Sequence, residues 1–200
     1  PTIRLSDVVA VGEATIVYDK EGNEIDQYVS TNSNRLSVGM DEIPDYLGKA
    51  FVAIEDERFY QHNGIDFKSI IRAGYQFFKT GGEEAQGAST ITQQLARNIF
   101  LSQEVTWQRK VEEIFIAVGL EKKYSKNQIL EFYLNNIYFG NGYYGVEAAA
   151  RGYFDKEINE LSLAEQVFIA AIIESGVPII SGTCTFNPYK ISPINTAIIH

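Results

Sequence analysis

The chain has 200 residues, of which 45% are hydrophobic and 22% are charged. This composition is that of an ordinary globular domain, and it excludes a disordered chain, which would have too few apolar residues to form a core. The formal net charge of −9 argues against nucleic acid as a partner, because nucleic-acid binders carry an excess of Lys and Arg that neutralises phosphates.

The sequence shows neither a membrane-spanning run of roughly 18 apolar residues nor a signal peptide. It begins at Pro1 rather than Met, so we expect it to be a piece of a longer protein. Its one cysteine, Cys184, and its two histidines, His62 and His200, form no cluster with metal-ligand spacing. We therefore predict no transition-metal site built from protein ligands alone.

The first 40 residues are predicted to form an appendage of strand and loop. Residues 15–25, with the sequence TIVYDKEGNEI, place a β-type run beside a polar turn signal at residues 19–22, which is typical of a hairpin. After Pro44, apolar residues recur at helical spacing as far as Ile54. We expect a helix there, with Glu55 at its end.

Further helices are predicted from N-cap residues that precede apolar residues at helical spacing. Asp66 begins one of them, which ends at the Gly81–Gly82 break. Capping-box pairs begin three others, namely Thr90 with Gln93, Ser125 with Gln128, and Ser162 with Glu165. The stretch YFGNGYYG at residues 138–145 is too rich in glycine for a regular helix and leads into a helix of small residues. The whole pattern predicts a mainly α fold with one hairpin.

Another predicted helix has an apolar side and a charged side. Its apolar side carries Trp107, Val111, Ile114 and Val118. Arg109 and Glu113, spaced i,i+4, share the opposite side, where such a pair is most often a surface ion pair worth a few tenths of a kcal/mol. The alternative is that Arg109 and Lys110 bind a pyrophosphate, which suits a guanidinium beside an ammonium.

The segment EDERFYQHNG at residues 55–64 gathers three carboxylates, an arginine and a histidine at a predicted helix end. Glu55 could act as a general base there if apolar surroundings raise the pKa of its carboxyl group. The alternative interpretation is a solvated, charged helix end, in which His62 is a structural residue near Gly64.

Two more segments could contact a ligand. GASTITQQLARN at residues 87–98 sets hydroxyl and amide side chains at a helix start, where backbone N–H groups favour anions; an ordinary capped surface helix is the alternative. In residues 126–140, the polar residues Glu131, Asn135 and Tyr138 alternate with apolar ones. Core packing is the default explanation for that second segment.

Taken in order, AIEDERFYQHNGID, GASTITQQLARN, RKVEEI and KNQILEFYLNNIYFGNGYYGVEAAARGYF resemble the motifs of the family 51 glycosyltransferases. These form the peptidoglycan polymerase domain of class A penicillin-binding proteins and of monofunctional transglycosylases. The resemblance covers roughly residues 50 to 175 and implies a lysozyme-like, two-lobed helical fold. It divides the chain into residues 1–40, a hairpin and linker that would follow a missing membrane anchor, and residues 41–200, the glycosyltransferase domain with a C-terminal end that stops early.

The resemblance implies an enzyme that polymerises lipid II, a disaccharide-pentapeptide on undecaprenyl pyrophosphate. The product would be a β-1,4 glycan strand, formed with inversion and with release of undecaprenyl pyrophosphate at the extracytoplasmic face of the cell membrane. Implied partners are lipid II, the lipid-linked glycan strand, the membrane surface and a transpeptidase domain in the same parent chain. The phosphoglycolipid moenomycin is the implied inhibitor.

By the same resemblance, Glu55 takes the proton from the acceptor 4-hydroxyl, and Glu113 is a second catalytic residue near the donor pyrophosphate. Glu113 would act either through a bridging magnesium or manganese ion or by direct electrostatic support, with no permanently bound cofactor. The implied substrate-binding residues are Asp56, Phe59, His62, Ser89, Thr90, Gln93, Gln94, Arg97, Arg109, Lys110, Glu131, Asn135 and Tyr138. Position 97 is often Lys in the family, and we expect Arg97 to serve equally, since both side chains satisfy a phosphate.

Two other parts of the chain bear on this interpretation. Residues 67–78 would belong to a membrane-facing small lobe, with core packing as the alternative, and a loop at residues 80–87 would order only with ligand. Residues 175–190, SGVPIISGTCTFNPYK, depart from the family pattern. This departure leaves an inactive scaffold that binds lipid II open as an alternative. A lytic enzyme of the same fold, with Glu55 as an acid, is the other alternative, although the segments TITQQL and RK would have little use with a neutral glycan.

Overall fold

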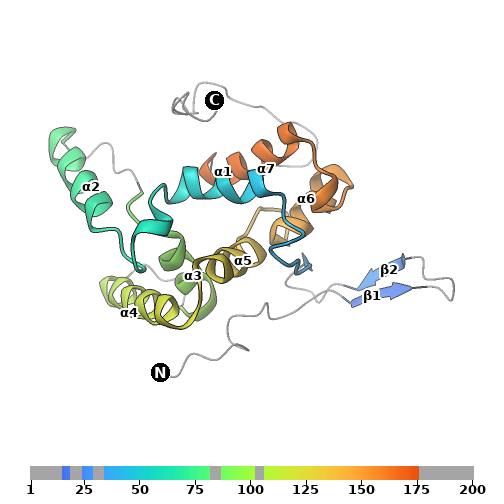
Figure 1. Ribbon diagram of the computed structural model, residues 1–200, viewed down its shortest axis with the longest axis horizontal. Coiled ribbons are helices and arrows are strands. Elements are labelled where there is room, and N and C mark those ends of the chain that lie inside the picture. Colours follow the sequence, from blue (N-terminus) through green and yellow to red (C-terminus); the bar gives the residue numbers. More distant parts are fainter. Residues whose placement is uncertain (1–14, 19–23, 29–33, 82–86, 102–105, 176–200) are drawn as a thin grey trace.

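The computed structural model describes residues 15–18, 24–28, 34–81, 87–101 and 106–175. Helices make up most of these residues, so the predicted mainly helical class is confirmed (Figure 1). The helices are α1 (Asp45–Glu55), α2 (Phe67–Lys79), α3 (Ile91–Phe100), α4 (Trp107–Lys123), α5 (Lys126–Asn136), α6 (Val146–Phe154) and α7 (Leu163–Ser175).

The strands are short. β1 (Thr15–Tyr18) pairs antiparallel with β2 (Glu24–Tyr28), and β3 (Asn34–Arg35) pairs parallel with β4 (Tyr143–Tyr144). The turn predicted at residues 19–22 lies outside the described residues. The same holds for most of the predicted loop at residues 80–87 and for nearly all of the unusual segment at residues 175–190.

Local signals at the helix starts act as predicted. Asp66 accepts hydrogen bonds from the backbone N–H groups of Lys68 and Ser69 and so caps α2. The capping boxes of Thr90 at α3 and of Ser125 at α5 are both complete. These side chains satisfy N–H groups that have no partner within the helix, so each helix begins at a residue fixed by the sequence.

The core lies between α1, α3, α5 and α7. α3 packs against both α4 and α5, and α1 packs against α7, as Figure 1 shows. Phe51 of α1 is fully buried, with its ring edge-on to Tyr133 at 6.2 Å and to Phe139 at 6.1 Å between ring centroids. Burial of each such ring contributes about 1.5 to 3 kcal/mol. This packing holds the end of α1 against α3 and α5, where Glu55 lies.

Gly145 permits the sharp turn between α5 and α6. Its φ is +88°, and a Cβ atom there would lie 2.8 Å from the carbonyl oxygen of Asn135. Only glycine fits both the conformation and the space. The prediction that residues 138–145 are not regular helix is confirmed, since they hold β4 and three glycines with positive φ.

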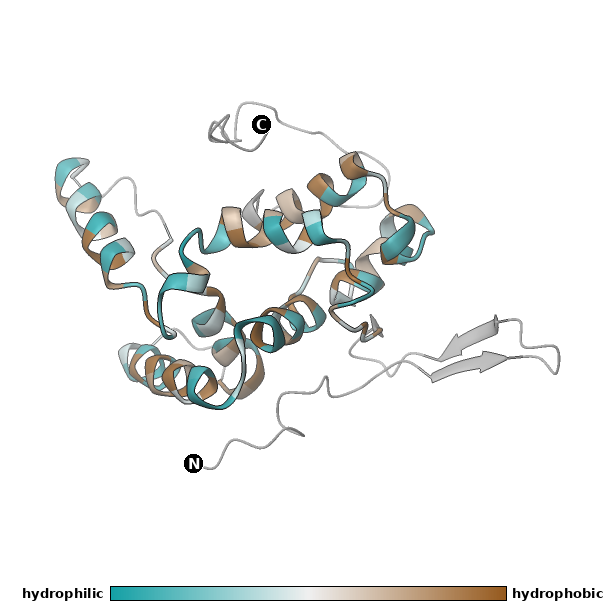
Figure 2. Ribbon diagram, viewed as in Figure 1, coloured by the Kyte–Doolittle hydropathy of each residue, from teal (hydrophilic) through white to brown (hydrophobic). Residues whose placement is uncertain are grey.

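Two apolar surfaces face outward. α2 has no buried residue, and its exposed side chains include Phe67, Ile71 and Phe78, so the core-packing alternative for this helix is wrong. In Figure 2 the brown and white residues of α2 alternate with teal ones on a helix that stands apart from the others. On α4, Trp107 is 73% exposed, whereas the side that we expected to be polar contains the buried residue Glu113.

An ion pair between Glu165 and Lys156 at the start of α7 should make the stability of the protein depend on pH. Hydrogen bonds first from Lys156 and then from Ser162 lower the pKa of the Glu165 carboxyl group from 4.5 to about 2. A carboxyl whose pKa is depressed in the folded state stabilises the protein above its unfolded pKa, and that stabilisation is lost as the pH falls from 4.5 toward 2. Glu165→Gln keeps a capping acceptor for Ser162 but loses the charge. We expect thermal denaturation to show a lower Tm for the variant at pH 7 and equal Tm values near pH 2.

Lys156→Met is the matched control, because it removes the other partner of the same ion pair. Its Tm deficit should follow the same pH curve. A deficit of Glu165→Gln that is constant from pH 7 to pH 2 would contradict the assignment of the pKa shift to this pair.

Candidate active site

Glu55 is the last residue of α1, and the chain leaves the helix at Asp56. The Asp56 carboxylate is buried and accepts a hydrogen bond of 3.0 Å from the backbone N–H of Ile91, the first residue of α3. The same carboxylate contacts His62 Nε2 at 2.9 Å. Asp56 therefore ties the end of α1 to the start of α3 and fixes the place of Glu55.

His62 is buried in this turn, and both of its ring nitrogens have protein partners, so its contact with substrate stays a prediction. Its Nδ1 accepts from the backbone N–H of Gly64 at 3.2 Å, so the hydrogen-bond network assigns the ring proton to Nε2, which donates to Asp56. Gly64 in turn accepts from the Thr90 hydroxyl at 2.7 Å. The turn after α1 is thus bound to the N-terminus of α3 at two points, one through Asp56 and one through Thr90.

The Glu55 carboxylate has a partner on α3. Gln94 Nε2 donates to Glu55 Oε2 at 2.8 Å, and Gln94 Oε1 accepts from the hydroxyl of Tyr133 at 3.3 Å. Sequence reasoning missed Tyr133, because it stands among apolar residues at helical spacing on α5 and was counted with the core. It is indeed fully buried, but its hydroxyl points to the amide that contacts Glu55.

Two cations lie near these groups. The charge of Arg97, one turn after Gln94 on α3, acts on Tyr133 and partly offsets the effect of Glu55. Lys110 Nζ on α4 donates to Ser89 Oγ at 2.8 Å and forms an ion pair with Glu113. Ser89 and Gln94 belong to the same segment at the start of α3, so that segment connects Glu55 to Lys110.

Glu113 corrects one prediction. The default interpretation of the helical pattern was a surface ion pair between Arg109 and Glu113, but Glu113 is 0% exposed and forms an ion pair with Lys110. Its second oxygen, Oε2, accepts no hydrogen bond from any of the described residues. The physical reason is that α4 packs on α3 through the side with Glu113, Ala117 and Leu120, which the apolar pattern did not identify.

Other predicted binding residues have protein contacts of their own. Asn135 Oδ1 accepts from the N–H of Val38, and Asn135 Nδ2 donates to the carbonyl oxygen of Val38, each at 2.9 Å. Glu131 accepts from the N–H of Met40 at 3.0 Å. Phe59 is fully buried below Lys126, whose ammonium lies 4.3 Å from the ring centroid. Contact of these three predicted residues with substrate stays a prediction.

The remaining predicted residues lie on different elements. Tyr138 is 50% exposed, and its ring lies against that of Tyr144 at 4.7 Å between centroids. Thr90 and Gln93 form the capping box of α3. Arg109 is half-buried on α4 beside Lys110. The structure therefore brings together Glu55, Gln94, Asp56 and the capping residues of α3, whereas Tyr138 lies beside Tyr144 of β4.

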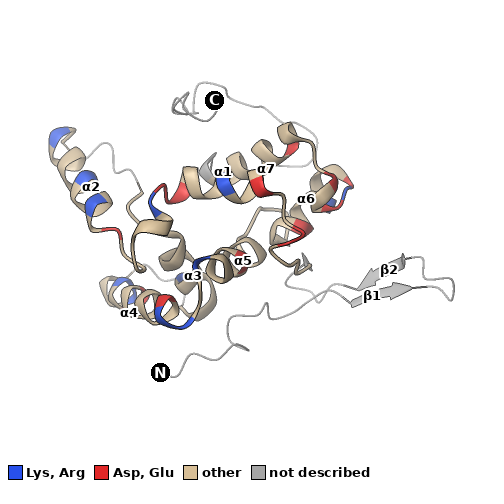
Figure 3. Cartoon of the chain, viewed as in Figure 1, with Lys and Arg blue, Asp and Glu red and all other residues tan. Residues whose placement is uncertain are grey.

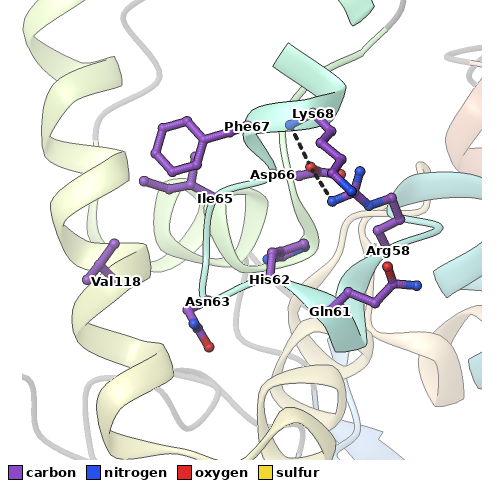
Figure 4. A pocket seen from close by; sticks show the side chains of 9 residues that line it. All are labelled: Arg58, Gln61, His62, Asn63, Ile65, Asp66, Phe67, Lys68 and Val118. Atoms are coloured by element: carbon purple, nitrogen blue, oxygen red, sulfur yellow. Dashed lines mark hydrogen bonds and ion pairs between the residues drawn. The ribbon is translucent and has the colours of Figure 1, made fainter. Parts of the chain in front are cut away.

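A separate hollow of about 490 Å³ lies at the base of α2 (Figure 4). Arg58 and Lys68 line it on one side, with Arg58 contacting Asp66 at 3.2 Å, and Phe67 and Val118 line it on the other. Glu55 and Lys110 are not among its lining residues. The hollow is therefore distinct from the groups around Gln94.

Metal ligands are scarce in the part of the chain that the structure describes. No three His, Cys, Asp or Glu side chains there gather in a way that could hold an ion. Within the same residues, no helix has the length and hydropathy to cross a bilayer.

Residues 21–180 match a family model described as Transglycosylase. The chain belongs to this family. The match spans the end of α1 with Glu55, the start of α3 and the Lys110–Glu113 pair, and it confirms the family resemblance drawn from the order of the motifs.

This transglycosylase domain is similar to penicillin-binding proteins. It is 47% identical to penicillin-binding protein 1F of Bacillus subtilis over 78% of the chain and 21% of that protein. It is 44% identical to penicillin-binding protein 1A of Clostridium tetani over 88% of the chain and 22% of that protein. The corresponding protein 1A of Escherichia coli is 46% identical over 86% of the chain and 19% of its own length. The chain thus spans about a fifth of these relatives.

Proposed function

We propose that this transglycosylase domain is a peptidoglycan glycosyltransferase that polymerises lipid II into β-1,4 glycan strands. One observation carries the proposal. Glu55 and the Lys110–Glu113 pair both bond the same short segment at the start of α3, Glu55 through Gln94 and Lys110 through Ser89. A carboxylate and a cation held on one short segment suit a displacement that needs a base at one end and charge stabilisation at the other.

In this reaction Glu55 accepts the proton of the acceptor 4-hydroxyl while the hydroxyl oxygen forms a bond to the anomeric carbon of the donor. The bond from that carbon to the pyrophosphate oxygen breaks, with inversion, and undecaprenyl pyrophosphate leaves. Pyrophosphate is a good leaving group, so the step needs one base and positive charge rather than a strong acid. Lys110, Arg109 and Arg97 supply that charge.

Glu113 supports the phosphate end. Its buried carboxylate holds Lys110 through one oxygen, and the other oxygen accepts no hydrogen bond within the part of the chain that the structure describes. A magnesium or manganese ion bound to the donor pyrophosphate would find one protein carboxylate here and would take its other ligands from phosphate and water, which is usual for magnesium.

The site works at a membrane surface in this proposal. α2 presents exposed Phe and Ile side chains together with Lys68, Arg72 and Lys79, and Figure 3 shows blue residues along this helix. Apolar and basic side chains on one exposed helix suit the interface of an anionic bilayer. α2 would belong to the small lobe of a two-lobed, lysozyme-like fold at the extracytoplasmic face, and the β1–β2 pair would follow the membrane anchor.

The relatives are named as penicillin-binding proteins and are several times as long as the matched region. We propose that the parent chain also contains a transpeptidase domain. Moenomycin mimics the lipid-linked donor. In this proposal it therefore inhibits the enzyme by competing with the donor pyrophosphate for the cations near Ser89.

Incubation of the domain with lipid II in detergent tests the proposal. The expected products are long glycan strands with β-1,4 links and free undecaprenyl pyrophosphate, and moenomycin should prevent both. Cleavage of purified cell wall in place of polymer formation would establish the lytic alternative. Binding of lipid II without any turnover would establish the inactive scaffold.

A further inference from the structure

Tyr133, Gln94 and Glu55 form a hydrogen-bond chain from α5 through α3 to the end of α1. The Tyr133 hydroxyl lies 3.3 Å from Gln94 Oε1, and Gln94 Nε2 lies 2.8 Å from Glu55 Oε2. The Tyr133 ring is fully buried and stands edge-on to Phe51, which precedes Glu55 by one helical turn. The Glu55 carboxylate is therefore linked, through one amide, to a side chain fixed by core packing.

The direction of this chain follows from charge. Burial, and then the negative charge of Glu55, raise the pKa of Tyr133 well above its ordinary value, so the hydroxyl keeps its proton. That proton is donated to the amide oxygen of Gln94, which leaves the amide N–H₂ group to face the carboxylate. The reversed amide would direct its oxygen at Glu55, and two acceptors would then repel each other.

Among the described residues, two other charges act on Tyr133. Asp56, beside Glu55 at the end of α1, acts on Tyr133 in the same sense as Glu55, and Arg97 of α3 acts in the opposite sense. Neither Asp56 nor Arg97 changes when the Tyr133 hydroxyl is removed. A variant at Tyr133 therefore isolates the contribution of the hydrogen-bond chain.

We propose that Tyr133 is a positioning residue that acts through Gln94 to hold the Glu55 carboxylate in one orientation and to favour its ionised form. The inference rests on the proposed function, because it takes Glu55 to be the base. A hydrogen bond to the charged form of a carboxylate favours that form, and an orientation fixed before the substrate arrives removes an entropic cost from the reaction. Tyr133 itself does not touch the substrate.

Tyr133→Phe removes the hydroxyl and keeps the ring against Phe51. We expect kcat to fall about tenfold with an unchanged KM for lipid II, and the acid limb of kcat/KM to move up by about one pH unit. Gln94→Met removes the whole chain and should cost at least as much. The double variant should be no slower than Gln94→Met alone, because the two residues act in series.

Tyr153→Phe is the matched control. The Tyr153 hydroxyl also donates a hydrogen bond, to the carbonyl of Phe139 at 2.7 Å, and burial raises its pKa as well, but Glu55 is not among the groups that shift that pKa. This variant should lower Tm as much as Tyr133→Phe does and leave the rate and the pH profile unchanged. Equal rate losses in the two variants, in proportion to Tm, would reduce Tyr133 to a structural role and overturn the proposal.

Titration of the Glu55 carboxyl by ¹³C NMR, assigned with Glu55→Gln, separates this inference from the proposed function. In Tyr133→Phe the titration midpoint should rise, whether or not the enzyme turns over. If Glu55→Gln stays active, the role of Glu55 as base fails, and the titration still tests the chain. An unchanged midpoint together with an unchanged kcat in Tyr133→Phe would overturn the inference itself.

Discussion

Glu55→Gln should lower the rate of lipid II polymerisation by about 10²- to 10⁴-fold, the usual contribution of a general base. Glutamine has the shape of glutamate and can still accept a hydrogen bond from Gln94 Nε2, so the end of α1 should keep its structure. It cannot accept the proton of the acceptor hydroxyl. Steady-state measurement with labelled lipid II gives the rate, and equilibrium binding of lipid II should change less than about threefold, since the substitution removes an interaction of the transition state.

Glu57→Gln is the matched control for this experiment. Glu57 is exposed and lies two residues after Glu55, so its substitution makes the same chemical change in the same segment. Its rate should equal that of the wild type, because exposed substitutions away from a site alter little. A Glu55→Gln domain that polymerises within a factor of two of wild type would exclude Glu55 as the base.

Those parts of the fold that depend on local chemistry were predictable from the sequence. The end of α1 at Glu55, the Asp66 cap and the capping boxes of Thr90 and Ser125 each depend on residues within four positions of one another. Such signals act on the backbone directly and survive in almost any tertiary context. They fix where each helix begins, and hence place Glu55 and the polar residues of α3 near helix ends.

Contacts between distant segments were not predictable. The burial of Glu113 depends on which side of α4 packs on α3, and the exposed Trp107 shows that the apolar side was the wrong guide. Asn135 bonds Val38 across 97 positions of sequence, which no local pattern reveals. The hydroxyl of Tyr133 is hidden for the same reason, since a tyrosine at helical spacing among apolar residues looks like any core residue.

Asp56→Asn should be the most destabilising of the conservative changes near the site. The Asp56 carboxylate accepts from two donors, the N–H of Ile91 and the Nε2–H of His62. Both donors reach Oδ2, and His62 Nε2 also lies 3.0 Å from Oδ1. An asparagine has one oxygen, so whichever of the two positions its amide N–H₂ group takes, that group faces the Nε2–H of His62. If His62 moved its proton to Nδ1 to relieve the conflict, that proton would face the N–H of Gly64, which now donates to Nδ1. Every arrangement leaves one buried donor without an acceptor.

An unsatisfied buried donor costs about 1 to 3 kcal/mol, which for a domain of this size lowers Tm by about 3 to 10 °C. Thermal denaturation measures this, with Asp155→Asn as the matched control. Asp155 is exposed with a φ of +55°, a conformation that asparagine tolerates well, so the control should melt within about 2 °C of wild type. Because Asp56 ties α1 to α3, its loss should also free the Glu55 carboxylate and lower kcat at temperatures where the variant stays folded. If the Tm of the Asp56→Asn variant equals that of the wild type, the turn after α1 is held by the Thr90–Gly64 contact alone.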